Sequence, residues 1–185
     1  MPLSGPAWVP LFPASRSTDD LTEPFRGNVD RFLAALRSAG AQINIAETLR
    51  PQARVYLMHY CFRIAREALD PGTVPAQDGV DIEWVHRNGQ GGPDVAASRA
   101  AAEQMVQGYE IVFRPSLTSH HCQGTAIDMT ISWQGDLRIT NAQGVQVLIN
   151  SGPRNGGNQL LQQVGAGYGV RKLATDPPHW SIDGH

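Results

Sequence analysis

The stretch SHHCQGTAIDMTIS, residues 119–132, contains a predicted strand and two polar residues, His121 and Asp128, that are candidates for a functional site. The second half, Ala126 to Ser132, has the residue types of a strand. His121 lies in the loop that enters this strand, and Gly124 allows the backbone to turn tightly there. Asp128 lies on the strand itself, where a rigid element can hold a carboxylate in a fixed position. The stretch therefore predicts a strand that carries a polar site.

Helical patterns dominate the part of the chain before this stretch. Asn28 precedes apolar residues at positions 29, 32, 33 and 36, which is the spacing of one helix face, and Gly40 can end that helix. Residues 42–48 alternate isoleucine with polar residues, which predicts a half-buried strand. A second helix is expected from Pro51 to Ala68. Further elements are expected as a loop over 70–93, a helix capped by Asp94, and a strand over 110–113.

Strand patterns dominate the part of the chain after residue 132. Strands are expected over 137–140, 145–149, 168–173 and 179–182, with one helix over 159–164. We therefore predict the α+β class, with a single domain in which helices pack on a small antiparallel sheet. Residues 1–24 are rich in proline and serine and are expected to form an extended lead-in to a domain over 25–185.

Composition and charge exclude several classes of function. The chain has 185 residues and a formal net charge of −2, with no cluster of Lys and Arg of the kind that binds nucleic acid. No apolar run approaches the ~20 residues that span a bilayer. The first residues, MPLSGPAWVPLFPASRS, lack the basic start of a signal peptide. We therefore expect a monomer that is made in the cytoplasm without a cleaved leader.

Three residues of the right chemical types form a candidate metal site. His121 and Asp128 come from the quoted stretch, and His179 opens the last predicted strand. A catalytic zinc ion takes three protein ligands of the types His, Asp and Glu and leaves one position for water. The sequence therefore predicts a Zn²⁺ cofactor held by these three side chains.

Two further residues are candidates for catalysis beside this site. Asp176 lies three residues before His179, and a carboxylate near a zinc-bound water can act as general base. Arg50 ends the strand segment QINIAETLR, residues 42–50, and an arginine there can bind a substrate carboxylate or an oxyanion. We expect Asp176 and Arg50 to be catalytic, and Arg50 also to bind substrate.

The segment SHHCQGTAID is similar to the S-x-H-x-x-G-x-A-x-D motif of the zinc D-alanyl-D-alanine carboxypeptidase and L-alanyl-D-glutamate peptidase family. The segments TLRPQAR, residues 48–54, and DPPHWS, residues 176–181, resemble that family's arginine segment and its acid-x-x-H motif. The resemblance implies zinc binding by His121, Asp128 and His179, a base at Asp176, and substrate binding by Arg50 and Ser119. The sequence departs from the family pattern in the long span between Arg50 and Ser119, which contains an extra loop and helix.

The resemblance implies hydrolysis of the stem peptide of peptidoglycan. The pairing of Asp with Pro-His at positions 176–179 is closer to the L-alanyl-D-glutamate endopeptidases of phage endolysins. A D,D-carboxypeptidase or D-Ala-D-Ala dipeptidase is the alternative enzyme, and a non-catalytic, metal-stabilised cell-wall-binding module is the alternative of another class. Because no leader is evident, a holin or a secretion machine would deliver the protein to the cell wall.

Two residues next to His121 leave alternatives open. His120 could replace His121 as ligand, because a strand-like backbone would point the two side chains in opposite directions. Cys122 could be a nucleophile, although adjacent side chains rarely form a nucleophile–base pair. Cys122 and Cys61 could form one disulfide, but we expect two reduced thiols.

Overall fold

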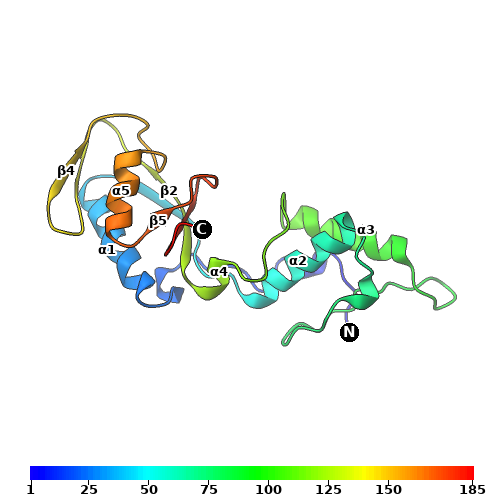
Figure 1. Ribbon diagram of the computed structural model, residues 1–185. Coiled ribbons are helices and arrows are strands. Elements are labelled where there is room, and N and C mark those ends of the chain that lie inside the picture. Colours follow the sequence, from blue (N-terminus) through cyan, green and yellow to red (C-terminus); the bar gives the residue numbers. More distant parts are fainter. The chain divides into compact units, whose positions relative to one another are not determined.

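The computed structural model, which describes residues 1–185 throughout, contains five α-helices and six short strands. Figure 1 shows their arrangement within the chain. The strands form two small antiparallel sheets, so the predicted α+β class is confirmed. Contacts group the chain into two compact units, one of Met1–Pro13 with Pro51–Ser119 and one of Ala14–Arg50 with His120–His185. This grouping differs from the expected boundary between residues 24 and 25.

The first unit is helical, and all six strands belong to the second. Helices α2 (Gln52–Arg66) and α3 (Val95–Gly108) pack together, and Asp94 caps α3 by accepting a hydrogen bond from the Ala97 amide, as predicted. The apolar faces of both helices surround Trp8, which is buried, so residues 1–13 contribute to a core and are not merely a surface lead-in.

The strand predicted over 110–113 is wrong. Glu110 follows α3 with a φ of 56°, which is left-handed, and the next residues form a bend with no partner strand. Val112 and Phe113 are 75% and 83% exposed, and only Ile111 of the apolar run packs against the core of the first unit.

The second unit begins with helix α1 (Phe25–Ser38), which starts three residues earlier than predicted. Its buried face consists of the predicted apolar positions together with Phe25, and Gly40 follows with a φ of 85°, as expected for a C-terminal glycine cap. Helix α5 (Gln159–Gly167) is longer than predicted and is capped by Asn158, whose side chain accepts from two main-chain amides.

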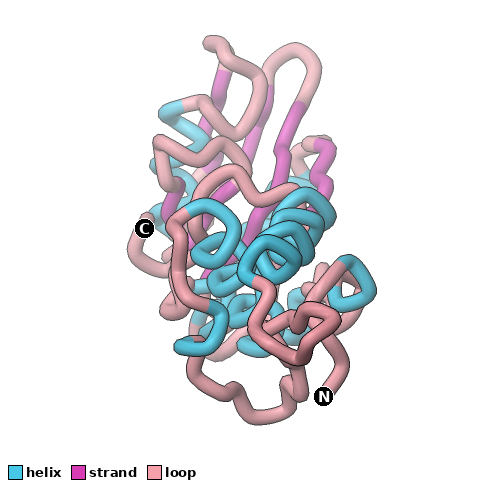
Figure 2. Tube along the Cα trace, turned by 90° about the vertical axis from the view of Figure 1, so that its right-hand side faces the viewer, coloured by secondary structure: helices cyan, strands magenta, loops and turns pink.

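The main sheet of this unit has the strand order β1-β2-β6-β5 and is antiparallel throughout. Its strands are β1 (Gln42–Glu47), β2 (Ala126–Ser132), β6 (His179–Ser181) and β5 (Arg171–Lys172), and Figure 2 shows the strands running alongside one another. The predicted strand over 168–173 is therefore only two residues long. Along β2, isoleucine and methionine side chains enter the core with α1 and α5, while Asp128 points to the opposite face.

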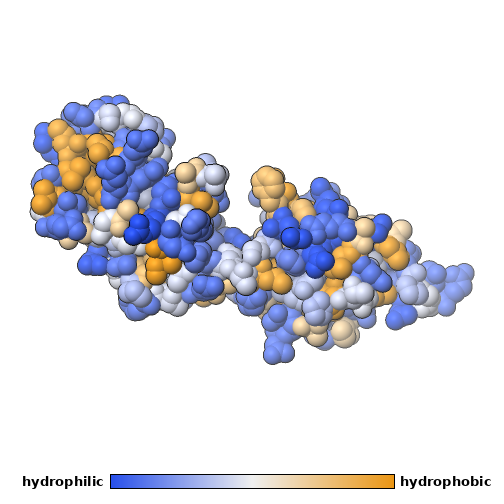
Figure 3. Space-filling view, in the orientation of Figure 1, coloured by the Kyte–Doolittle hydropathy of each residue, from blue (hydrophilic) through white to orange (hydrophobic).

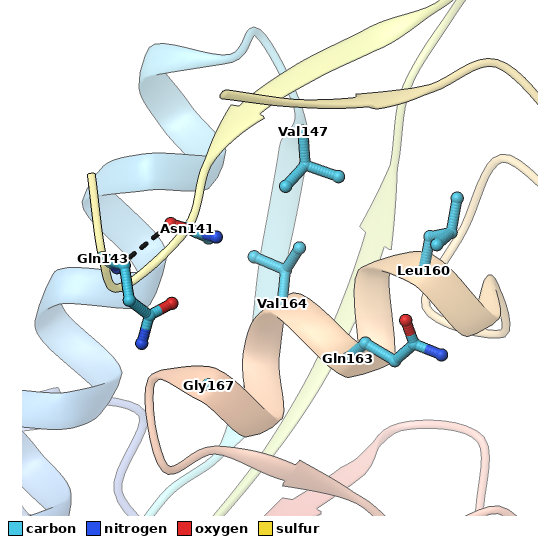
Figure 4. Close-up of a pocket in the computed structure, with 7 residues that line it drawn as sticks. All are labelled: Asn141, Gln143, Val147, Leu160, Gln163, Val164 and Gly167. Atoms are coloured by element: carbon cyan, nitrogen blue, oxygen red, sulfur yellow. Dashed lines mark hydrogen bonds between the residues drawn. The ribbon is translucent and has the colours of Figure 1, made fainter. Parts of the chain in front are cut away.

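The remaining strands, β3 (Leu137–Thr140) and β4 (Gln146–Ile149), form a separate hairpin. A hollow of about 180 Å³ lies between this hairpin and α5. Figure 4 shows its lining, which consists of Val147, Leu160, Val164, Gly167 and uncharged polar side chains. Figure 3 shows apolar atoms gathered over the same elements, where Val145, Leu148 and Leu160 are exposed. No residue that lines this hollow carries a titratable side chain.

No helix of the structure combines the length and the apolar character that crossing a membrane requires.

Two glycines of α5 provide a test of the packing beneath the main sheet. A methyl group added at Gly165 would lie 2.9 Å from the Trp180 ring and 2.9 Å from the main-chain oxygen of Val170, whereas one added at Gly167 would meet nothing within 4 Å. We expect Gly165→Ala to lower the free energy of unfolding by about 1–3 kcal/mol, because overpacking forces the core apart. Gly167→Ala, the matched control, should change it by less than about 1 kcal/mol. Equal effects in denaturant titrations would contradict this packing.

Candidate metal centre

The main sheet aligns three polar residues in one row across adjacent strands. Asp128 on β2 is the register partner of Glu47 on β1 and of His179 on β6. A register shift between Ile45 and Glu47 places Ala46 as an extra residue, and this bulge brings Glu47 opposite Asp128. Directly opposed residues point to the same face of a sheet, so the three side chains lie together on the face away from the core.

His121 reaches this row from a short helix, α4 (His120–Gln123), and not from the loop that the sequence predicted. Gly124 links α4 to β2 with a φ of 68°, and an added methyl group would approach the main chain at Asp20 and Thr22. Only glycine combines this left-handed backbone with so close an approach. The turn therefore delivers the buried His121 side chain to the edge of the row.

Three side-chain atoms converge where His121 meets the sheet. The Asp128 Oδ1 atom lies 3.2 Å from His121 Nε2 and 3.0 Å from His179 Nδ1, and the two ring nitrogens are 3.2 Å apart. Both histidines are buried, and the carboxylate is half-buried. These three residues form a group that could hold a metal ion.

The outer ring nitrogens of both histidines contact main-chain oxygens. His121 Nδ1 lies 2.8 Å from the Thr48 oxygen, and His179 Nε2 lies 3.1 Å from the His185 oxygen. Because a carbonyl oxygen only accepts, each of these nitrogens must carry the hydrogen and donate it. In the neutral rings, His121 Nε2 and His179 Nδ1 therefore keep their lone pairs, and both lone pairs face Asp128. Histidine ligands of metals are oriented in this way in proteins.

The charges at this group depend on one another. Burial alone would raise the pKa of Asp128, but the hydrogen bonds and charge that protonated His121 and His179 rings offer to the carboxylate hold it well below its usual range. Burial alone would lower the pKa of His121, but the hydrogen bond and charge of Asp128 raise it above its usual value. The carboxylate therefore favours a positive charge beside it, which a proton on His121 or a metal ion can supply.

His120 faces away from the group. Its Nδ1 lies 2.9 Å from the Thr125 hydroxyl, and its Nε2 lies 3.2 Å from a carboxylate oxygen of Asp183. The side chains of His120 and His121 diverge in the helical turn of α4. Of these two neighbouring histidines, only His121 contacts Asp128.

Arg50 lies beside the group but is already paired. Its Nε and Nη2 atoms donate to the two carboxylate oxygens of Glu47, at 2.5 and 2.8 Å, and its main-chain amide donates to the His121 oxygen. Burial alone would lower the pKa of Arg50, but Glu47 raises it, with a smaller contribution from the charge of Asp128. The Nη1 edge of the guanidinium is therefore the one that could contact a substrate.

The structure does not bring every expected residue into the group. Asp176 is exposed in the turn before β6, and its carboxylate is not among the converging atoms, although its main-chain oxygen accepts from the His179 amide. Ser119 is half-buried and is the last residue of the first unit. Both cysteines are thiols: Cys61 is buried on α2 and Cys122 is half-buried on α4, outside the metal-binding group.

Sequence reasoning missed the contacts that support the group. The spacing of three residues between Glu47 and Arg50 is the sequence signal that could have indicated their ion pair at the end of β1. The oxygens of Thr48 and His185 could not be foreseen, because a main-chain oxygen has no sequence signature. Lys172 lies in the strand predicted over 168–173, and its contacts with main-chain oxygens likewise have no sequence signature.

A scan of protein-family models finds no match to the chain, and a search of curated proteins finds none either.

Metal content provides a direct test of the three ligands. We expect alanine at His121, Asp128 or His179 to abolish near-stoichiometric metal binding, because each substitution removes one of three converging donors. His120→Ala is the matched control and should retain the metal, since its ring contacts Thr125 and Asp183 instead. Elemental analysis of the purified variants measures both. Metal lost from the His120 variant and kept by the His121 variant would reverse the assignment.

Proposed function

We propose that the protein is a zinc peptidase that cleaves the stem peptide of peptidoglycan. The observation that carries this proposal is the convergence of two histidine nitrogens and one carboxylate oxygen within 3.2 Å of one another, with both outer ring nitrogens directed at main-chain oxygens. A purely structural histidine pair has no need of two lone pairs that face a carboxylate. The motif around these residues supplies the class of substrate.

Zinc fits the donor set better than the hard cations. Ligands held ~2.0–2.1 Å from a tetrahedral zinc lie about 3.3 Å from one another, close to the three separations here. Calcium and magnesium prefer sites made of oxygen atoms alone, and they are bound at more than three positions. Two imidazoles and one carboxylate also match the three-ligand pattern of catalytic zinc, in which a further position takes water.

Zinc bound there would polarise the scissile carbonyl and lower the pKa of a coordinated water. The chain's own residues would complete the reaction. Asp176, on the exposed turn before β6, would accept the proton of that water and return it to the leaving amine. Arg50, held by Glu47, would present its Nη1 edge to the substrate, with Ser119 as a further contact.

Cleavage between L-alanine and D-glutamate is the activity that we propose, because Asp176 followed by Pro-His resembles the pattern of phage endolysins of that type. Such a substrate carries carboxylates, which suits an arginine fork beside the metal. Delivery to the cell wall by a holin or a secretion machine belongs to the same proposal.

Digestion of purified peptidoglycan tests this proposal. We expect metal-loaded protein to release fragments with a newly exposed D-glutamate amine, which mass spectrometry of the products detects, and we expect a chelator to stop the reaction. Release of D-alanine would instead identify a D,D-carboxypeptidase, and release of the D-Ala-D-Ala dipeptide a dipeptidase. Binding to cell wall with no new fragment would identify a metal-stabilised binding module and contradict the peptidase proposal.

The same digestion, run with variants, separates the base from the ligands. Asp176→Ala and Asp176→Asn should retain the metal and lose about 100- to 10,000-fold in cleavage rate, because neither side chain can accept the proton. Asp136→Ala is the matched control, since Asp136 is an equally exposed aspartate in the turn after β2. Cleavage by Asp176→Ala at the wild-type rate would transfer the role to another group, of which Glu47 is the nearest candidate.

A further inference from the structure

The ammonium of Lys172 donates to three main-chain oxygens of a single loop. Its Nζ atom lies 2.6 Å from the Leu173 oxygen, 2.5 Å from the Asp176 oxygen and 3.1 Å from the His179 oxygen. A lysine ammonium has three donors and no acceptor, so all of its hydrogen-bonding capacity is used within this loop. Charged donors make the stronger hydrogen bonds in proteins, which makes this contact a substantial restraint.

The three oxygens lie at the start, the middle and the end of the loop over residues 173–179. The loop connects β5 to β6, and it carries both the proposed base Asp176 and the metal-site residue His179. Its own main-chain hydrogen bonds join Leu173, Asp176 and His179. Pro177 and Pro178 have no amide hydrogen to donate, so the segment between base and ligand has few donors of its own. Lys172 supplies the donors that the prolines lack.

The surroundings of Lys172 hold the ammonium in place. Its Nζ lies 5.7 Å from the centre of the Trp180 ring, which is fully buried beneath the sheet. Burial lowers the pKa of Lys172, and the charges of Asp176 and Asp128 partly offset this effect. The ammonium is therefore near both carboxylates while its hydrogen bonds go to the main chain.

We propose that Lys172 is a positioning residue, which clamps the loop over 173–179 so that Asp176 and His179 keep a fixed relative position at the metal centre. The clamp on His179 follows from contacts alone, and the effect on turnover rests on the peptidase function proposed above. Lys172 contacts His179 only at its main-chain oxygen and is not one of the three residues whose side chains converge, so it acts through the loop.

Lys172→Met tests the clamp, because methionine keeps an unbranched apolar side chain and removes all three donors. Arg171→Met is the matched control, since Arg171 is the exposed neighbour on the same strand. Hydrogen exchange of the metal-loaded proteins should show amides of residues 173–179 exchanging roughly 10- to 100-fold faster in Lys172→Met, as expected on loss of charge-assisted hydrogen bonds. Dissociation of the metal into excess chelator should accelerate over a similar range, and the control should match wild type in both.

Turnover separates positioning from general support of the fold. At a temperature at which the variant remains folded and metal-loaded, Lys172→Met should lower kcat by about 10- to 100-fold with KM nearly unchanged, because a displaced base affects the chemical step. In a Cys122→Ser background, Lys172→Cys should behave alike, and its alkylation with bromoethylamine, which rebuilds an ammonium at nearly the same length, should restore kcat. Lys172→Gln serves as a second neutral variant if Lys172→Met does not fold.

Two results would overturn the clamp. One is hydrogen exchange and metal dissociation at the wild-type rates in both neutral variants. The other is faster exchange of the loop amides with a kcat that is unchanged, or with a lowered kcat that alkylation does not restore. If the wild-type protein cleaves no peptidoglycan, the peptidase function fails by itself. Loop exchange and metal dissociation then still decide whether Lys172 clamps the loop.

Discussion

Two histidine lone pairs and one carboxylate face one another within 3.2 Å, and this arrangement requires a positive charge among them. Both outer ring nitrogens donate to main-chain oxygens, so neither ring can rotate to relieve the contact without losing a hydrogen bond. The pKa of Asp128 is low and the pKa of His121 is raised, because the negative carboxylate and a positive ring stabilise each other. A bound divalent cation would satisfy all three acceptors at once, so this group could hold a metal ion.

The remainder of the second unit holds those three atoms in position. Successive side chains of β2 point to opposite faces of the sheet. Ile127 and Met129 are buried in the core, so Asp128 between them lies on the other face. The bulge in β1 adds Glu47 to the row, and Glu47 in turn orients Arg50. On the opposite side of β2, Lys172 on β5 donates three hydrogen bonds to main-chain oxygens of the loop that precedes β6. The sheet thus fixes Asp128 on β2 and His179 at the start of β6, while His121 depends on the short helix α4.

Local patterns in the sequence were sufficient for helices α1, α2, α3 and α5, for β1 and β2, and for the three residues of the candidate metal group. The apolar spacing in α1 and the cap at Asp94 act within a few residues, so they are visible without the fold. The strand predicted over 110–113 failed because β-propensity needs a partner, and the first unit has none. The Arg50 pair, the α4 turn and the Lys172 contacts depend on neighbours and main-chain oxygens that no spacing rule records. The part of the site that chemistry dictates was therefore predictable, and its supporting contacts were not.

X-ray absorption spectroscopy of the purified, metal-loaded protein tests the metal centre most directly, because it reports which atoms bind the ion and at what distance. We expect zinc with a first shell of nitrogen and oxygen at ~2.0–2.1 Å, including the outer-shell signal of two imidazoles. A sulfur atom at ~2.3 Å would show that Cys122 binds the ion and contradict the ligand set of His121, Asp128 and His179. Absence of imidazole scattering would contradict the metal centre itself.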